Sequence, residues 1–188
     1  MSGNTEFTLR VQDCTARLAA VGVDALGALF DLTSHRLVRF AITLTRNQHD
    51  AEDCVQTALV RVAREPGLLA SVTSPWAYLL RMVRNEALVL ARRKRSRPVL
   101  GDLTDLVTFR RVDELEREET HREVWAALRT IPVEQAEVVV LKIWEEMTFA
   151  EIGQILDTSP HTAASRYQYA LAKLTRRLAP SQREVHHD

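Results

Sequence analysis

Apolar residues recur along this chain with the spacing of helices and almost nowhere with the strict alternation of strands. In the stretch 148–156, for example, Phe149, Ile152, Ile155 and Leu156 fall on one side of a helix. Glycine and proline, six of each, are too few to interrupt many such segments. The pattern predicts helices at about 24–45, 50–64, 75–97, 112–130, 134–145, 148–156 and 160–174, and hence an all-α protein.

The last two predicted helices are separated by a very short turn. Thr148, with Glu151 three residues later, is typical of a capping box at the start of the first helix. Ser159 can cap the second helix, whose first position suits Pro160 because no backbone N–H is needed there. Such a pair favours a helix-turn-helix, which presents its second helix to the major groove of DNA. An ordinary helical hairpin is the alternative.

The second of these helices carries many polar and basic side chains and no acidic one between Pro160 and Leu178. Ala163, Tyr167, Ala170, Leu171 and Leu174 form its predicted inner stripe. Such a helix can lie against phosphate. Its outward candidates for DNA contact are His161, Thr162, Ser165, Arg166 and Lys173, followed by Arg176 and Arg177.

Breaks in the helical pattern divide the chain into two small helical domains joined by a flexible linker. Asp24 can cap the first long helix, and Pro98 and Gly101 stand where the periodicity is lost. The N-terminal extension either adds a helix or is partly disordered. The division is an extension at 1–23, domains at 24–97 and 112–178, a linker at 98–111 and a tail at 179–188, with the helix-turn-helix in the second domain.

The 188 residues, 46% of them hydrophobic, suffice for one or two modest cores. The formal net charge is +0, but the charges are segregated along the chain. Residues 81–97 hold seven basic residues and one acid, Glu86, whereas residues 102–123 hold eight acids and four bases. This distribution suggests several charged partners, or one partner that is touched at several places.

Several classes of protein are disfavoured. Cys14 and Cys54 lack the spacing of a metal site, fit a reducing compartment, and are expected to be small buried or half-buried residues. No run is apolar enough to span a membrane, and the N-terminus lacks the pattern of a signal peptide, so we expect a soluble intracellular protein. No phosphate loop, metal cluster or nucleophile–base pair is visible, so we expect neither enzymatic activity nor a cofactor.

Four segments in order carry a resemblance to a known family. They are HRLVRFAITLTRNQHDAEDCVQTALVRV (35–62), SPWAYLLRMVRNEALVLARRKR (74–95), IPVEQAEVVVLKIWEEMTFAEIGQIL (131–156) and SPHTAASRYQYALAKL (159–174). Over roughly residues 24–178 the chain resembles the bacterial sigma-70 family, specifically its small extracytoplasmic-function (ECF) group. The order and spacing of several motifs make this more specific than a lone helix-turn-helix.

The resemblance implies a transcription initiation factor in the bacterial cytoplasm, associated with the nucleoid when bound to polymerase. The first domain would melt the promoter and dock on polymerase, and the second would recognise the promoter. Its expected partners are core RNA polymerase and promoter DNA, as duplex and as melted strand, with an anti-sigma factor as a further candidate. A stand-alone helix-turn-helix regulator, which would need no polymerase-docking surface, is the runner-up.

The segment DAEDCVQ resembles the helix that binds the coiled coil of the polymerase clamp subunit. The resemblance makes Asp50, Glu52, Asp53 and Gln56 candidate polymerase contacts. The alternative is a solvated acidic face that suits the positive end of a helix dipole. Cys54 replaces the leucine usual in the family, which affects packing more than docking.

By the same resemblance, the loop 65–73 and the start of the helix at Trp76 correspond to the part of the family that captures an extruded base of the minus-ten element. Capture of an unpaired base needs a stacking wall and polar groups that read the base edge. Trp76 could be that wall, although a tryptophan at this spacing is more often core, and Asn85 can donate and accept. Val89 replaces a frequent aspartate, so selectivity does not transfer. The candidates are Trp76, Arg81, Arg84, Asn85, Arg92, Arg93 and Lys94.

The resemblance also places the helix 160–174 in the major groove of the minus-thirty-five element. Arg166 is the strongest candidate, because a guanidinium can bridge guanine acceptors or bind a phosphate. Ala164 replaces a frequent lysine and Tyr167 an aliphatic residue, which leaves the preferred sequence open. In the linker, Asp102 and Asp105 could mimic nucleic-acid charge inside the polymerase, or the segment is only a solvated tether.

Overall fold

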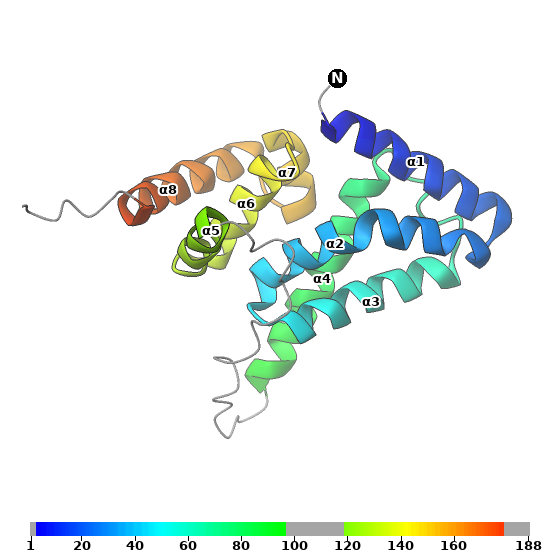
Figure 1. Ribbon diagram of the computed structural model, residues 1–188, viewed down its shortest axis with the longest axis horizontal. Coiled ribbons are helices and arrows are strands. Elements are labelled where there is room, and N and C mark those ends of the chain that lie inside the picture. Colours follow the sequence, from blue (N-terminus) through cyan, green and yellow to red (C-terminus); the bar gives the residue numbers. More distant parts are fainter. Residues whose placement is uncertain (1–2, 97–118, 179–188) are drawn as a thin grey trace, which may run out of the picture.

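The structure, a computed structural model, describes residues 3–96 and 119–178 (Figure 1). Over these residues it has helices and no strand, which confirms the predicted all-α class. The linker at 98–111 with Asp102 and Asp105, the tail at 179–188 and the start of the helix expected from about 112 lie outside the described residues. The helices are α1 (Gly3–Val21), α2 (Leu26–Thr45), α3 (Gln48–Arg64), α4 (Pro75–Ser96), α5 (Glu119–Arg129), α6 (Val133–Ile143), α7 (Phe149–Leu156) and α8 (Pro160–Leu178).

Helices α2, α3 and α4 pack on one another in the N-terminal half, residues 3–96. The turn between α2 and α3 is tight because Arg46 adopts a left-handed conformation with φ 57° and Asn47 caps α3. The Asn47 side chain accepts a hydrogen bond from the Asp50 backbone N–H at 3.0 Å. Apolar residues at helical spacing are buried between these helices. They are Ala51, Val55, Ala58, Leu59 and Val62 on α3 and Trp76, Leu79, Leu80, Val83 and Ala87 on α4.

The N-terminal extension forms a long helix, α1, which packs on α2 and α4. Val11 and Leu18 anchor it, since both are fully buried. The predicted cap at Asp24 is wrong: a short 3-10 turn, Val23–Ala25, precedes α2 and contains Asp24. Helix α2 therefore begins at Leu26 without a side-chain cap.

Helices α5 to α8 form the C-terminal half, residues 119–178, in which α8 packs against α5, α6 and α7. The capping box at Thr148 and Glu151 is present as predicted. On α8, Ala163, Ala170 and Leu174 are buried. The prediction that Leu171 belongs to the inner stripe is wrong, since this residue is 37% exposed. Ala170 and Leu174 already fill the buried side of that turn.

The two halves lie against each other, with α2 beside α6 and α4 beside α7 (Figure 1). Among the described helices none is both long and apolar enough to cross a bilayer. The contact between the halves brings polar side chains of α1, α2 and α4, and of the turn after α2, to the turns that precede and follow α6. This contact governs which candidate site residues are accessible.

Candidate nucleic-acid interface

The turn between α7 and α8 has the close packing of a helix-turn-helix. Gly153 lies so near the turn that a Cβ on it would stand 2.7 Å from the Thr158 carbonyl oxygen. Asp157 takes a left-handed conformation, with φ 54°, and ends α7. Ser159 then caps α8, since its Oγ accepts a hydrogen bond from the Thr162 N–H at 3.0 Å. The sequence prediction of a capped helix starting at Pro160 is confirmed.

The candidate DNA contacts of α8 lie on one exposed or partly exposed face. His161 is exposed, while Thr162, Ser165, Arg166 and Lys173 are partly exposed. The Thr162 hydroxyl lies 2.8 Å from the Ser159 hydroxyl, so it shares in the cap. Tyr167 is partly buried and its ring packs against Phe149, with centroids 5.8 Å apart. Tyr167 therefore acts in packing on α7.

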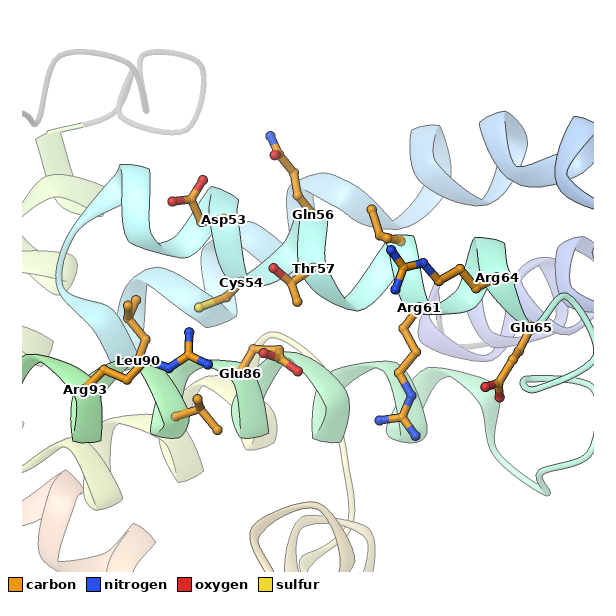
Figure 2. A pocket seen from close by; sticks show the side chains of 12 residues that line it. Asp53, Cys54, Gln56, Thr57, Arg61, Arg64, Glu65, Glu86, Leu90 and Arg93 are labelled. Atoms are coloured by element: carbon orange, nitrogen blue, oxygen red, sulfur yellow. The ribbon is translucent and has the colours of Figure 1, made fainter.

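The four polymerase candidates occupy the first turns of α3 and face partly or fully outward. Asp50 pairs with Lys94 of α4 at 2.6 Å, so two candidates of different surfaces neutralise each other. Glu52 accepts a hydrogen bond from the Gln48 amide at 2.8 Å. Asp53 and Gln56 are exposed, and both line a groove between α3 and α4 (Figure 2).

That groove contains charged groups of both signs and has Cys54 at its base (Figure 2). Cys54 is 4% exposed, and burial, helped by the nearby Asp50, raises its pKa to about 11. The thiol thus stays protonated at neutral pH and serves in packing. Cys14 is half-buried, so the predicted burial of the two cysteines is confirmed.

The minus-ten candidates on α4 fall into two groups. Arg81, Asn85, Arg92, Arg93 and Lys94 are exposed, so they can reach a partner in this conformation. Trp76 and Arg84 point instead into the contact between the halves. Trp76 is only 2% exposed and meets the Phe7 ring edge-on, with centroids 4.9 Å apart. In this arrangement Trp76 is a core residue, which is the alternative that its spacing in the sequence favoured.

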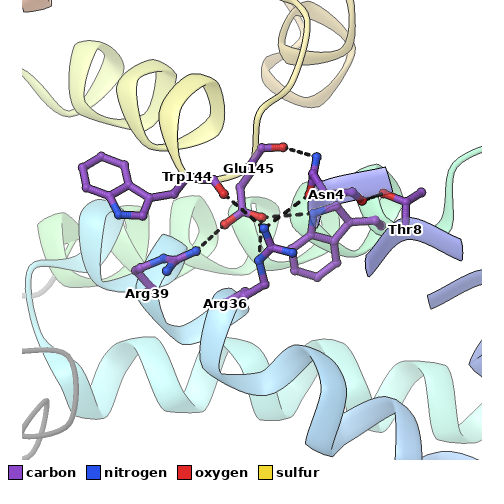
Figure 3. Close-up of polar contacts among 7 residues, drawn as sticks. Asn4, Thr8, Arg36, Arg39, Trp144 and Glu145 are labelled. Atoms are coloured by element: carbon purple, nitrogen blue, oxygen red, sulfur yellow. Dashed lines mark hydrogen bonds and ion pairs between the residues drawn. The ribbon is translucent and has the colours of Figure 1, made fainter. Parts of the chain in front are cut away.

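Glu145, in the turn after α6, is the centre of the contact (Figure 3). Its side chain is fully buried. The carboxylate oxygens lie 2.8 Å from Arg39 Nη2 and 3.2 Å from Arg36 Nε, and both arginines belong to α2. The Trp76 indole N–H also donates to this carboxylate at 3.2 Å. Burial lowers the pKa of Arg36, while the Glu145 carboxylate opposes that shift. Three donors thus compensate the buried charge.

A second buried carboxylate, Glu137 on α6, pairs with Arg84. The Arg84 Nε donates at 2.9 Å and Nη2 at 3.5 Å, and the Glu137 side chain is 2% exposed. Burial raises the pKa of Glu137, and the Arg84 hydrogen bond opposes the increase. The loss of hydration therefore raises the pKa of this carboxylate by more than the Arg84 guanidinium lowers it.

In the hydrogen bonds between the halves that follow, the N-terminal half supplies the donors and the C-terminal half supplies carboxylate or carbonyl acceptors. Asn4 donates to the Glu145 carbonyl at 2.6 Å, Arg36 to the Trp144 carbonyl at 3.1 Å, and Arg46 to the Ile131 carbonyl at 3.0 Å. The side-chain acceptors are Glu137 and Glu145.

The sequence analysis did not single out Glu137 or Glu145. It also did not single out Arg36 and Arg39, which both pair with Glu145. A signal for Glu137 was present, because it stands in the run AEVVVL, and Val133, Val140 and Leu141 are apolar neighbours at helical spacing. Glu145 gave no such signal, since it follows the end of α6 beside Glu146 and resembles an exposed polar turn. Only the packing of the halves reveals its burial.

Two family models match the chain. Sigma-70 region 2 matches residues 29–97, and Sigma-70, region 4 matches residues 121–174. The chain is 30% identical over 154 residues to the ECF RNA polymerase sigma factor SigM of Mycobacterium tuberculosis, covering 82% of this chain and 77% of SigM. It is 31% identical over 143 residues to the RNA polymerase sigma-E factor of Streptomyces avermitilis, covering 76% of this chain and 78% of that protein.

Two solved structures share the fold. The structure of CnrH in complex with the cytosolic domain of CnrY matches with a TM-score of 0.60 and 22% identity, over 88% of this chain and 94% of that chain. The sigma factor RpoE of Bartonella quintana, solved with the anti-sigma factor NepR, matches with a TM-score of 0.58 and 20% identity, over 78% and 91% of the two chains.

Proposed function

Because the chain belongs to the ECF group of RNA polymerase sigma factors, we propose that α3, α4 and α8 divide its work among polymerase, melted promoter and duplex promoter. The protein binds core RNA polymerase and directs promoter recognition, melting and transcription initiation. The family evidence does not favour the stand-alone regulator. What we propose is the assignment of residues and domains, with the chain acting in the bacterial cytoplasm and at the nucleoid when polymerase-bound.

The polymerase surface in this proposal is the outward face of α3, with Asp50, Glu52, Asp53 and Gln56. The exposure of Asp53 and Gln56 beside a groove supports it, since a docking helix can enter there. The Asp50–Lys94 pair links this surface to the minus-ten surface of α4. We assign the domain 24–97 to docking and melting on this basis.

The two DNA surfaces differ in what they touch. On α8, His161, Thr162, Ser165 and Arg166 follow a capped helix N-terminus, the part of a recognition helix that meets base edges. Lys173 lies farther along, where a phosphate contact fits. On α4, the candidates for the melted region that are exposed are Arg81, Asn85, Arg92, Arg93 and Lys94. Trp76 and Arg84 would join them once exposed. Domain 112–178 is thus the promoter-recognising unit.

The single observation that carries the proposal is the order of the two matched regions, together with exposed or partly exposed candidates on α3, α4 and α8. Purified core RNA polymerase should start transcription at defined sites only when this chain is added. Start sites mapped on a fragmented bacterial genome would identify its promoters. The absence of any start site dependent on the chain would reject the proposal.

A further inference from the structure

The exposed face of α3 carries charged side chains of both signs that have few partners within the chain. Arg61 and Arg64, in its last turns, have no ion pair or side-chain hydrogen bond among the described residues. Asp53, near its start, has only the exposed His49 at 3.8 Å in that part of the chain. The groove between α3 and α4, which these residues line, holds three acids and three arginines (Figure 2). Equal numbers of both charges favour a partner that carries both signs over a polyanion such as DNA.

Helix α4 forms the other wall of this groove. Arg93 and Glu86 line it, and neither has an ion-pair partner within the residues that the structure describes. The two helices run antiparallel, since Asp50 at the start of α3 pairs with Lys94 at the end of α4. Arg93 therefore stands beside the acidic start of α3, and Glu86 stands beside its middle (Figure 2).

The exposed positions of α3 in the groove have a spacing that is symmetric about the point between residues 58 and 59. They are Asp53, Gln56, Thr57, Val60, Arg61 and Arg64. When a second α3 is laid antiparallel on the first about that point, Asp53 of each copy faces Arg64 of the other. In the same register Val60 faces Thr57, and the Gln56 amide oxygen can accept from Arg61. The face is thus complementary to itself.

The two unpaired charges on α4 fit the same arrangement. Glu65 follows Arg64 directly, so the end of the second α3 brings its Glu65 beside Arg93 of the first copy. Glu86 lies eight residues before Lys94, level with residue 58 of α3. Arg61 of the second copy arrives two residues from that level, or about 3 Å along the helix axis, within reach of its long side chain.

The centre of the symmetric face is apolar. Val60 is 50% exposed, and Val89 on the α4 wall is 37% exposed. Both side chains lose contact with water when a second helix enters the groove, which favours association. One helix laid in a groove buries less than the roughly 1,200 Å² at the lower limit of a standard interface. We therefore expect weak association, with a dissociation constant above about 1 µM.

We propose that the α3–α4 groove binds α3 of a second copy of this chain, and that the result is a two-fold dimer with the two α3 helices antiparallel. Across the axis Asp53 pairs with Arg64, Glu65 with Arg93, and Glu86 with Arg61. The dimer covers Asp53 and Gln56, two of the candidate polymerase contacts, so a chain in the dimer does not dock on polymerase. Only this exclusion rests on the proposed function.

Charge exchange tests the dimer and its register. Sedimentation velocity of the full-length chain, from about 1 µM upwards, should show dimers whose fraction rises with concentration. Asp53→Arg brings arginines together at both ends of the contact, and Arg64→Glu brings acids together, so each variant alone should stay monomeric. An equimolar mixture of the two should form dimers again, because the two substituted positions then face each other. A mixture that stays monomeric while circular dichroism shows both variants folded overturns the proposal.

Two further variants test the contact in other ways. Arg10→Glu makes the same charge change at an exposed position of α1 and should dimerise like the wild type. Loss of the dimer in this variant would show that net charge, and not α3, governs association. Val60→Asp places a carboxylate at the apolar centre and should lose the dimer. Dimers that persist in Val60→Asp would refute the α3 contact.

The relation to polymerase is measured with the wild-type chain. Donor- and acceptor-labelled copies, mixed at a concentration at which they dimerise, should lose energy transfer as core polymerase is added. Transfer that persists in polymerase-bound chains would refute the shared surface. A wild type that stays monomeric at every concentration, while Val60→Asp weakens polymerase binding, would assign the groove to polymerase alone and overturn the dimer. A chain that binds no polymerase would reject the proposed function and leave the sedimentation result standing.

Discussion

A carboxylate that is almost fully buried is harder to ionise than one in water, and the groups around Glu137 decide by how much. Burial raises its pKa, Arg84 of α4 and Arg166 of α8 lower it, and Glu134 on its own helix raises it. Burial is the largest of these causes. Folding therefore binds a proton more tightly at this position than the unfolded chain does.

The sign of the pH dependence follows. The folded pKa exceeds the unfolded value of about 4.3, so the stabilising contribution of Glu137 is fully present below that value and is lost as pH rises through the folded pKa. Urea unfolding of the wild type and of Glu137→Gln should show that the wild type loses stability relative to the variant as the pH rises above about 4.3. Parallel pH curves for the two proteins would contradict the assignment.

Arg166 and Asn85 separate the two DNA surfaces. Arg166→Ala should lose about 1–3 kcal/mol of discrimination between upstream promoter sequences, because a guanidinium reads guanine in duplex DNA. Asn85→Ala should leave that discrimination intact and reduce strand opening, since an exposed amide near the melted strand stabilises only the open state. Binding assays measure the first effect, and permanganate footprinting of unpaired thymines measures the second.

Arg17→Ala serves as the control for both variants, because Arg17 is an exposed basic residue of α1, a helix that carries none of the candidate contacts. It should change neither upstream discrimination nor strand opening. Normal opening by Asn85→Ala, or wild-type sequence preference in Arg166→Ala, would show that the assignment of that residue is wrong even though the family membership stands.

At the scale of elements, the helix-turn-helix depends on how closely α7 approaches the turn. Gly153→Ala should destabilise the protein by about 1–3 kcal/mol, as overpacking does, because its Cβ would meet the Thr158 carbonyl. Gly27→Ala, in α2 with open space around it, should instead stabilise by about 0.4–1 kcal/mol. Thermal unfolding of both variants measures the contrast, and equal effects would argue against a tight turn.

Helix α3 should dock on polymerase through charge. Reversing Glu52 and Asp53 to lysine should weaken binding to core polymerase and leave thermal stability nearly unchanged, because exposed pairs contribute only about 0–1 kcal/mol. Asp31→Lys, an exposed reversal on α2, is the matched control. Fluorescence anisotropy with labelled chain measures the affinity. Wild-type affinity in the double reversal would remove α3 from the docking surface.

Local signals predict the elements of this chain well. The capping box at Thr148, the Ser159 cap and the stripe of α3 follow from interactions within a few residues, and the structure confirms them. The prediction at Asp24 was wrong because Asp24 lies within a short 3-10 turn, Val23–Ala25, which the helical periodicity does not distinguish from the start of α2. The candidates on α8 follow from the helix-turn-helix pattern and the charge of that helix, whereas those on α3 and α4 depend on the family resemblance. The roles of all of them stay predictions.

At the scale of the whole molecule, the arrangement of the halves was beyond sequence reasoning. Helical periodicity says which face of α6 is buried but not that α2 covers part of it, and Glu145 has no local pattern that marks it as buried. Trp76 illustrates the limit, since its spacing suits a core and its indole N–H needs a partner that lies in the other half.

The free chain should bind duplex promoter DNA poorly. Each half offers few base contacts, the melted strand exists only within the polymerase complex, and Trp76 and Arg84 are occupied. Gel-shift titration with and without core polymerase measures the difference, which should exceed about tenfold at equal salt, since salt alone changes such affinities strongly. Tight sequence-specific binding by the free chain would favour the stand-alone regulator.

The separation of donors and acceptors between the halves also limits how copies of this chain can associate. Two N-terminal halves would bring arginines together, and two C-terminal halves would bring carboxylates together, so neither pairing of like with like reproduces the contact. A reciprocal exchange, in which each chain inserts its C-terminal half against the partner's N-terminal half, reproduces all of it. If copies of this chain associate through this surface, we therefore expect swapped dimers, whose fraction would rise with protein concentration.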